Sequence, residues 1–68
     1  MSYPSLERFG YHIKQARLQH GWEPAVLAEK VHMSVTDLLD IERGRKDVSI
    51  VYAQLLAFAL DVSVTELL

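Results

Sequence analysis

Three basic side chains stand close together in the middle of this sequence. Arg43, Arg45 and Lys46 follow a short stretch that carries Asp37 and Asp40. Exposed arginine and lysine side chains are the usual partners of phosphate groups, so the cluster is suited to contact a nucleic-acid backbone. The structural alternative is a solvated loop whose positive charges are balanced by its acidic neighbours.

The other residues that can do chemistry do not form a recognisable site. His12, His20 and His32 lack the spacing of metal ligands, and the chain contains no cysteine to complete a zinc site. Serine, histidine and aspartate all occur, but nothing in their order places them as a catalytic triad, and a small helical domain offers no sizeable cleft. We therefore expect no enzyme activity, no metal and no cofactor.

Two short helices joined by a tight turn must position the basic cluster. The stretch PAVLAEKVHMSVTDLLDIERGR, residues 24–45, carries apolar residues at helical spacing on both sides of HMS. Ser34 is a good N-cap with Asp37 three residues later, as in a capping box, and Gly44 supplies a left-handed stop. The pattern predicts a helix-turn-helix at about 24–43, in which the second helix, residues 34–43, is offered to a partner.

Three further helices complete the expected fold. Tyr3-Pro4 keeps the start of the chain extended, and Ser5 is expected to cap the first helix. Ser49 is expected to cap a fourth helix, and Ser63 opens a short final helix with a second capping box. The apolar positions expected to face the core are Leu6, Phe9, Ile13, Ala16, Leu27, Ala28, Val31, Leu38, Ile41, Ile50, Ala53, Leu56, Ala57 and Leu60.

Two glycines have different roles in the first helix. Gly21 is expected to end it. Gly10 lies inside it, where glycine is less favourable than alanine by about 1 kcal/mol.

Length and composition limit the class of protein. Sixty-eight residues, of which 50% are hydrophobic, make a single domain over 1–68, near the lower size limit for a stable core. The N-terminus lacks the features of a signal peptide, and LLAFAL, the longest apolar run, is too short to span a bilayer. We therefore expect a cytoplasmic protein without membrane contact. The net charge of −2 is unusual for a nucleic-acid binder, although the position of the charges matters more than their sum.

These elements, in this order, resemble the Cro and phage-repressor (Xre-type) helix-turn-helix family. The resemblance runs from about Phe9 to Leu68 and rests on IKQARLQHGW, LAEKV, HMS, DIERGRKDVS and LLAFALDVSVTELL. It implies an all-α, five-helix, lambda-repressor-like DNA-binding domain. Such proteins place the third helix in the major groove, so the resemblance also implies a sequence-specific transcriptional regulator that binds double-stranded DNA.

The resemblance assigns site residues position by position. It implies that bases are read by Val35, Thr36, Leu39 and Asp40, and that the DNA backbone is contacted by Asp37, Arg43, Arg45 and Lys46. Helix geometry agrees, because Leu38 and Ile41 face the core and leave these reading positions outside. A buried, structural ion pair between Arg17 and Glu42 is also implied.

The chain differs from the family's pattern at the start of the second helix, on the reading face of the third helix and in the turn between them. Pro24 stands where a glutamine commonly meets phosphate, and it has no amide donor. Val35 and Leu39 can touch only thymine methyl groups, and Asp40 can only accept from cytosine or hold an arginine. His32 replaces the turn glycine, so it must adopt a positive φ or shift the turn.

Two functions fit these features. The first is a homodimeric repressor that reads a pseudo-palindromic operator, with its dimer contact at the apolar end of the chain, Val62, Val64, Leu67 and Leu68. The second is a protein-interaction module on the same fold, whose acidic and apolar third helix binds a protein partner in place of DNA. A sensing domain that follows Leu68 would also fit the abrupt apolar end.

Overall fold

Helices are the only regular structure in residues 6–68, the part of the chain that the computed structural model describes. They are α1 (Leu6–Gln19), α2 (Pro24–Lys30), α3 (Val35–Glu42), α4 (Ile50–Leu60) and α5 (Val64–Leu67). The prediction of an all-α, five-helix fold is confirmed. The predictions for Tyr3-Pro4 and Ser5 lie outside the described residues. Within residues 6–68, no helix has the length and apolar character needed to cross a membrane.

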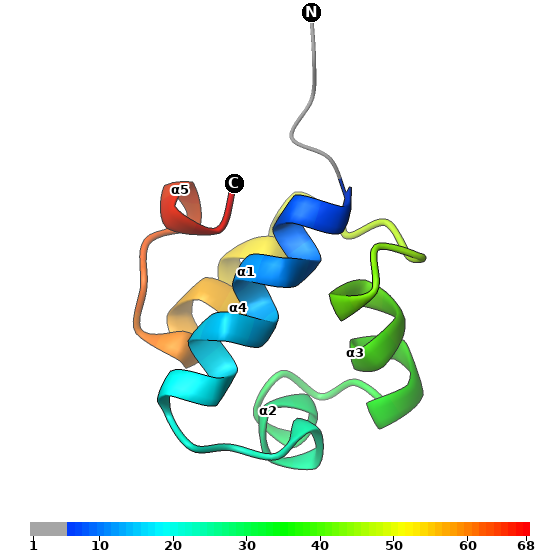
Figure 1. Cartoon of the computed structure of the whole chain (residues 1–68), viewed down its shortest axis with the longest axis vertical. Coiled ribbons are helices and arrows are strands. Elements are labelled where there is room, and N and C mark those ends of the chain that lie inside the picture. The colour runs from blue at the N-terminus through cyan, green and yellow to red at the C-terminus, as the bar shows by residue number, and fades with distance from the viewer. Residues whose placement is uncertain (1–5) are drawn as a thin grey trace, which may run out of the picture.

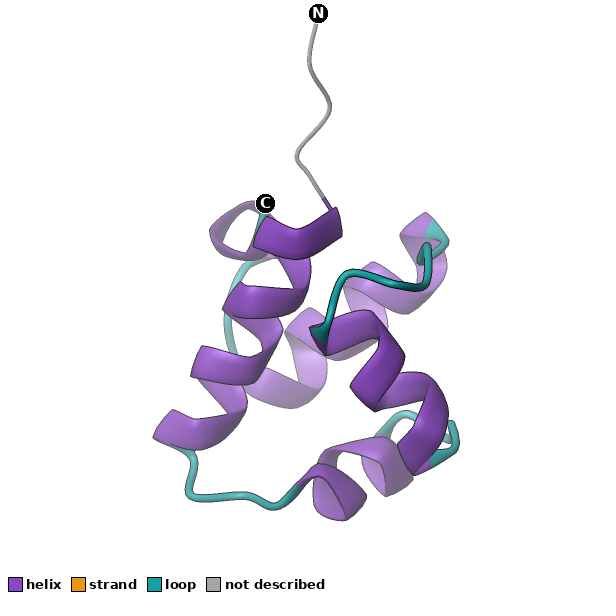
Figure 2. Cartoon of the chain, turned by 45° about the vertical axis from the view of Figure 1, so that its right-hand side comes forward, coloured by secondary structure: helices purple, strands orange, loops and turns teal. Residues whose placement is uncertain are grey.

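The long helix α1 lies at the centre of the bundle (Figure 1). It contacts α3, α4 and α5, while α2 contacts α3. The two views agree that α3 and the C-terminal α5 lie on opposite sides of α1 (Figures 1 and 2). α1 therefore connects the helix-turn-helix with the end of the chain.

The first four helices end in the same backbone arrangement. In each, an N–H donates to the carbonyl five residues earlier, over 2.8–3.2 Å: Trp22 to Arg17, Met33 to Ala28, Arg45 to Asp40, and Val62 to Ala57. The residue before each donor is left-handed: Gly21 (φ 73°), His32 (φ 58°), Gly44 (φ 74°) and Asp61 (φ 60°). Glycine is preferred at such ends, so the two predicted glycine stops are confirmed. The histidine and the aspartate adopt the same conformation at a steric cost.

Serine hydroxyls cap α3 and α4 as the sequence predicts. The Ser34 hydroxyl accepts from the Asp37 N–H over 3.0 Å, and the Ser49 hydroxyl accepts from the amide three residues later over 3.2 Å. The predicted capping box at Ser63 is wrong, because this side chain makes no cap hydrogen bond to α5. Its hydroxyl lies 3.0 Å from the hydroxyl of Thr65 instead.

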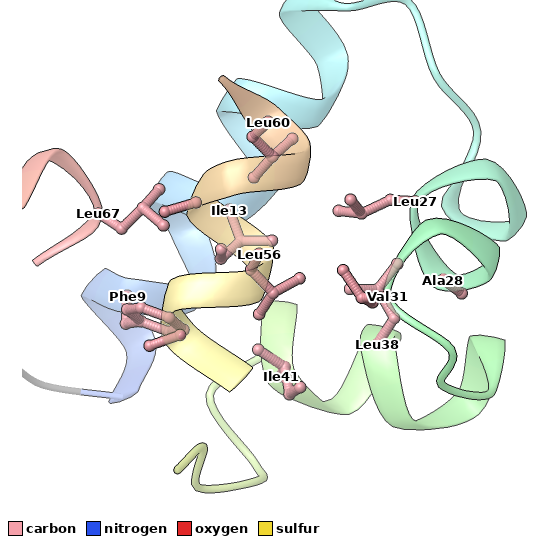
Figure 3. Packing of buried hydrophobic residues seen from close by; sticks show 12 residues of the cluster. Phe9, Ile13, Leu27, Ala28, Val31, Leu38, Ile41, Leu56, Leu60 and Leu67 are labelled. Carbon is pink, nitrogen blue, oxygen red and sulfur yellow. The ribbon is translucent and has the colours of Figure 1, made fainter. Parts of the chain in front are cut away.

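The core is built from the inward sides of all five helices (Figure 3). Its largest fully buried side chains are Ile13, Leu27, Leu38, Ile41, Leu56, Leu60 and Leu67. The inward positions expected for Leu6 and Ile50 are wrong, since these side chains are 40% and 66% exposed. Each is the first residue of its helix, and both line an open groove on the surface instead of filling the core.

α1 and α3 approach so closely at Gly10 that no side chain fits between them. A Cβ atom at this position would overlap the carbonyl oxygen of Ile41 and lie 2.6 Å from that of Glu42. Both oxygens belong to the backbone of α3 and cannot rotate away. The expectation that alanine would be the better residue here is therefore wrong, because it rested on helix propensity alone.

Replacing Gly10 with alanine is expected to destabilise the protein by about 3 kcal/mol, because α1 and α3 must separate. Gly21→Ala is the matched control. A Cβ at Gly21 meets nothing within 4 Å, so only its left-handed φ matters, at a cost of about 1 kcal/mol. Chemical denaturation of both variants measures the difference. If both variants lose the same free energy of unfolding, α1 and α3 separate at Gly10 with little cost, and the prediction is wrong.

Candidate nucleic-acid interface

α3 lies at the edge of the molecule with one side buried and the other accessible. Leu38 and Ile41 anchor it in the core, with exposed fractions of 0% and 2%. The four predicted base-reading residues lie on the other side: Val35 and Thr36 are exposed, and Leu39 and Asp40 are half-buried. Their spacing places them on adjacent rows of one helix face, which is the geometry needed to enter a groove.

The turn before α3 keeps its geometry although it lacks a glycine. His32 has a φ of 58°, and its N–H donates to the Glu29 carbonyl over 3.2 Å. Met33 donates to the Ala28 carbonyl over 3.0 Å. Of the two outcomes expected for His32, the chain therefore adopts the positive φ, and the turn is not shifted.

A buried ion pair ties the end of α3 to α1, as the resemblance implies. The Nε–H of Arg17 donates to Glu42 Oε2 over 2.7 Å, and Nη2 donates to Oε1 over 3.0 Å. Nη1 donates to the Trp22 carbonyl over 2.8 Å, in the loop before α2. The two charged side chains are only 6% and 3% exposed. The guanidinium therefore fixes α3 and the approach to α2 on the same helix.

The predicted basic cluster is exposed but surrounded by acid. Arg43, Arg45 and Lys46 are all accessible to solvent in the loop after α3. Lys46 Nζ lies 3.6 Å from a carboxylate oxygen of Asp37, and both side chains are about half exposed. With Asp40 on α3 and Asp47 in the loop, three acidic residues match the three basic ones. Attraction of phosphate at this surface depends on local position rather than on net charge.

The start of α2 offers little to an anion. Pro24 occupies its first turn and has no N–H, and the preceding Glu23 makes no side-chain cap. The exposed carboxylate of Glu23 also places a negative charge beside the positive end of the helix dipole. The glutamine contact common in the family is therefore absent from this chain.

A groove between the first turns of α3 and α4 is a second accessible feature. Its volume is about 490 Å³, and both serine caps, Ser34 and Ser49, line it. Lys46 and two carboxylates, those of Asp37 and Asp47, line it as well. Two helix N-termini and a lysine amine therefore meet at one concave surface. The sequence did not predict this groove, because the two capping serines are fifteen residues apart in the chain.

The outer side of α4 is the largest apolar feature that sequence reasoning missed. Ile50, Val51, Leu55 and Phe58 are 66%, 60%, 44% and 86% exposed. A signal was available, because IVYAQLLAFAL is apolar on every side, and such a helix is normally covered on every side.

The residues predicted to form a dimer contact have different environments. Val62 and Val64 are half-buried and pack against the core. Leu67 is 1% exposed and is a core residue of its own chain, so its surface is not available to a partner. Leu68 is 44% exposed and lines a groove of about 670 Å³ together with Ile50 at the start of α4.

Two histidines hold the end of the chain onto α1. The Nδ1–H of His12 donates to the Leu67 carbonyl over 2.9 Å, and the Nε2–H of His20 donates to the Leu60 carbonyl over 2.7 Å. These bonds satisfy carbonyls at the ends of α5 and α4. Residues 6–68 contain no group of three His, Cys, Asp or Glu side chains arranged to hold a metal ion.

The model of the helix-turn-helix family HTH_3 matches residues 13–67. The chain therefore belongs to this family, and its resemblance to Cro and phage-repressor proteins is confirmed. The family and its solved relatives, which are regulatory proteins, support a DNA-binding regulator of transcription. None of the curated proteins compared with the chain matches it.

Several solved structures share the whole arrangement. The restriction-modification controller protein C.AhdI from Aeromonas hydrophila is 32% identical, with 97% of this chain and 100% of that chain covered and a TM-score of 0.89. The clp gene regulator ClgR from C. glutamicum is 30% identical, with 98% and 86% covered and a TM-score of 0.90. A hypothetical transcription factor, NHTF from Neisseria, is 25% identical, with 96% and 75% covered and a TM-score of 0.89.

Replacing Glu42 with glutamine is expected to destabilise the fold by about 3–5 kcal/mol, because the Arg17 charge stays buried without its counterion. Asp37→Asn is the matched control, since it breaks an ion pair that is half exposed. It should change stability by less than about 1 kcal/mol.

The free energy of unfolding from urea titrations tests this comparison. A double variant, Arg17→Met with Glu42→Leu, should recover most of the loss, because it removes both buried charges together. A Glu42→Gln variant as stable as Asp37→Asn would contradict the structural role of the pair.

Proposed function

We propose that this protein is a homodimeric transcriptional repressor that places α3 of each copy in the major groove of a pseudo-palindromic operator. The observation that carries the proposal is the position of α3, with its inner side held in the core and its outer side accessible. Leu38, Ile41 and the Arg17–Glu42 pair hold its inner side, while Val35 and Thr36 stay exposed directly after a capped N-terminus. A helix held in this way can enter a groove without losing contacts to its own core.

Phosphate contacts are proposed on both sides of α3. Arg43 and Arg45 contact the phosphate backbone of DNA from the loop that follows α3. The groove between the caps of α3 and α4 receives a second phosphate, which Lys46 and the two helix N-termini contact. Binding separates Lys46 from Asp37. This costs little free energy, because the pair is 3.6 Å apart and about half exposed to solvent.

The dimer contact is proposed on α4 rather than at the last residues alone. Val51, Leu55 and Phe58 follow one another at helical spacing and are all exposed. A two-fold interface brings the same patch of each copy together, so one apolar helix face is sufficient to build it. Leu68, which lines a groove with Ile50 at the start of α4, extends this surface. Operator occupancy by such a dimer would repress by excluding other proteins from the site.

Selection from a random duplex library tests the proposal directly. We expect enrichment of a pseudo-palindrome whose half-sites lie about 34 Å apart, one turn of DNA. Arg45→Ala and Lys46→Ala should each reduce the slope of log affinity against log salt by about 1, because each removes one phosphate contact. Lys14→Ala is the control, since it removes an exposed charge from α1 and should leave the slope unchanged. Folded protein that enriches no sequence would overturn the proposal.

Replacing Phe58 with serine tests the dimer. This variant should be monomeric in sedimentation experiments and should bind the full operator at least about tenfold more weakly, because one half-site is lost to each complex. Leu18→Ser is the matched control, since Leu18 is 50% exposed on α1 outside the proposed interface. A Phe58→Ser protein that remains dimeric would place the interface elsewhere.

A second candidate function is favoured by the acidic residues of α3. Asp40 lies at a position where the family resemblance implies a neutral or basic side chain, and Asp37 adds a second negative charge to α3. A protein partner with a basic surface would complement both. The selection experiment separates the two functions, because a protein-interaction module would enrich no duplex while remaining folded.

A further inference from the structure

The accessible side of α3 has almost no hydrogen-bond donors. Of its four outward side chains, Val35 and Leu39 are apolar, Asp40 is a carboxylate that only accepts, and Thr36 supplies one hydroxyl. Guanine is normally read by donors that reach its N7 and O6 acceptors. This side of α3 is therefore unsuited to guanine, and its chemistry matches groups found on pyrimidines.

The two apolar side chains are not explained by the core. Val35 is 39% exposed. Leu39 is half-buried, yet it is absent from the hydrophobic side chains of residues 6–68 that pack against the core cluster. The two residues are one turn apart on the same row of the helix, next to the row that holds Thr36 and Asp40. Val35 and Leu39 thus form an apolar strip beside the Asp40 carboxylate, on the accessible side of α3.

We propose that α3 recognises DNA through the C5-methyl groups of pyrimidines, so that the protein reads thymine and 5-methylcytosine in its site. This inference rests on the proposed function. In the major groove, Val35 and Leu39 contact the methyl groups, and Asp40 accepts from the N4 amino group of cytosine. A 5-methylcytosine carries both the methyl group and the amino donor, and therefore complements the apolar strip and the carboxylate together.

The charge of the surface makes these base contacts important. Three acidic residues, Asp37, Asp40 and Asp47, oppose the three basic residues of the loop. Attraction to phosphate, which is the sequence-independent part of binding, is reduced accordingly. Base contacts therefore supply a larger share of the binding free energy than they would on a more basic surface.

The test uses the full chain and the duplex obtained by selection. At each thymine of the half-site, affinity is measured with thymine and with uracil, which differ only in the C5-methyl group. The same positions are then measured with 5-methylcytosine and with cytosine, paired with guanine. At positions that face α3, the methyl group should strengthen binding about fourfold in both comparisons.

Variants connect the methyl effect to α3. Val35→Ala and Leu39→Ala change exposed or half-exposed side chains and should reduce the methyl effect at the positions they contact. Leu18→Ala is the control on α1 and should leave it unchanged. Asp40→Asn should shift the preferred base at its position from cytosine toward adenine, since an amide can both donate to and accept from adenine.

The outcomes separate this inference from the proposed function. Selective binding in which no thymine-to-uracil change matters would overturn methyl recognition and leave the regulator intact. A methyl effect that persists in the combined Val35→Ala and Leu39→Ala variant would show that α3 does not cause it. If no duplex is selected, the proposed function and this inference fall together.

Discussion

The arrangement of the helix-turn-helix on α1 depends on the buried hydrogen bonds of the Arg17 side chain. Its side chain is almost fully buried, so its charge must be matched by Glu42, and Nη1 donates to the Trp22 carbonyl. Glu42 is the last residue of α3, and Trp22 precedes α2. One buried group on α1 therefore holds both the end of α3 and the loop that leads into α2.

The exposed surfaces follow a different principle from the core. α3 carries acidic side chains and the loop after it carries basic ones, which meet in the pair of Lys46 and Asp37. α4, in contrast, presents an almost continuous apolar side. The first surface is suited to selective contacts and weak general attraction. The second is suited to association with another apolar surface. The two lie on different helices, so each can act without competing for the same residues.

Local signals predicted the fold well, and contacts between distant residues explain the errors. Ser34 and Gly44 are recognisable because a cap or a left-handed stop needs only its neighbours. The role of Gly10 depends on the backbone of α3, about thirty residues away, and no local pattern reveals it. Ile50 fits the apolar periodicity of α4 but lines an open groove at the start of the helix and stays exposed. Helix geometry predicts the accessible side of α3, where Val35, Thr36, Leu39 and Asp40 lie. The groove at the two caps required the three-dimensional structure.

The backbone contact at Gly10 also determines how the protein can respond to changes in DNA. With no side chain between them, α1 and α3 move as one body, and α1 in turn contacts α4 and α5. In the proposed dimer, the distance between the two copies of α3 would then depend on the contact between the two copies of α4. Inserting one base pair between half-sites rotates the second by about 34°. A dimer whose two α3 helices keep a fixed separation cannot follow that rotation. Such a dimer would therefore select operators by the spacing of their half-sites as well as by their sequence.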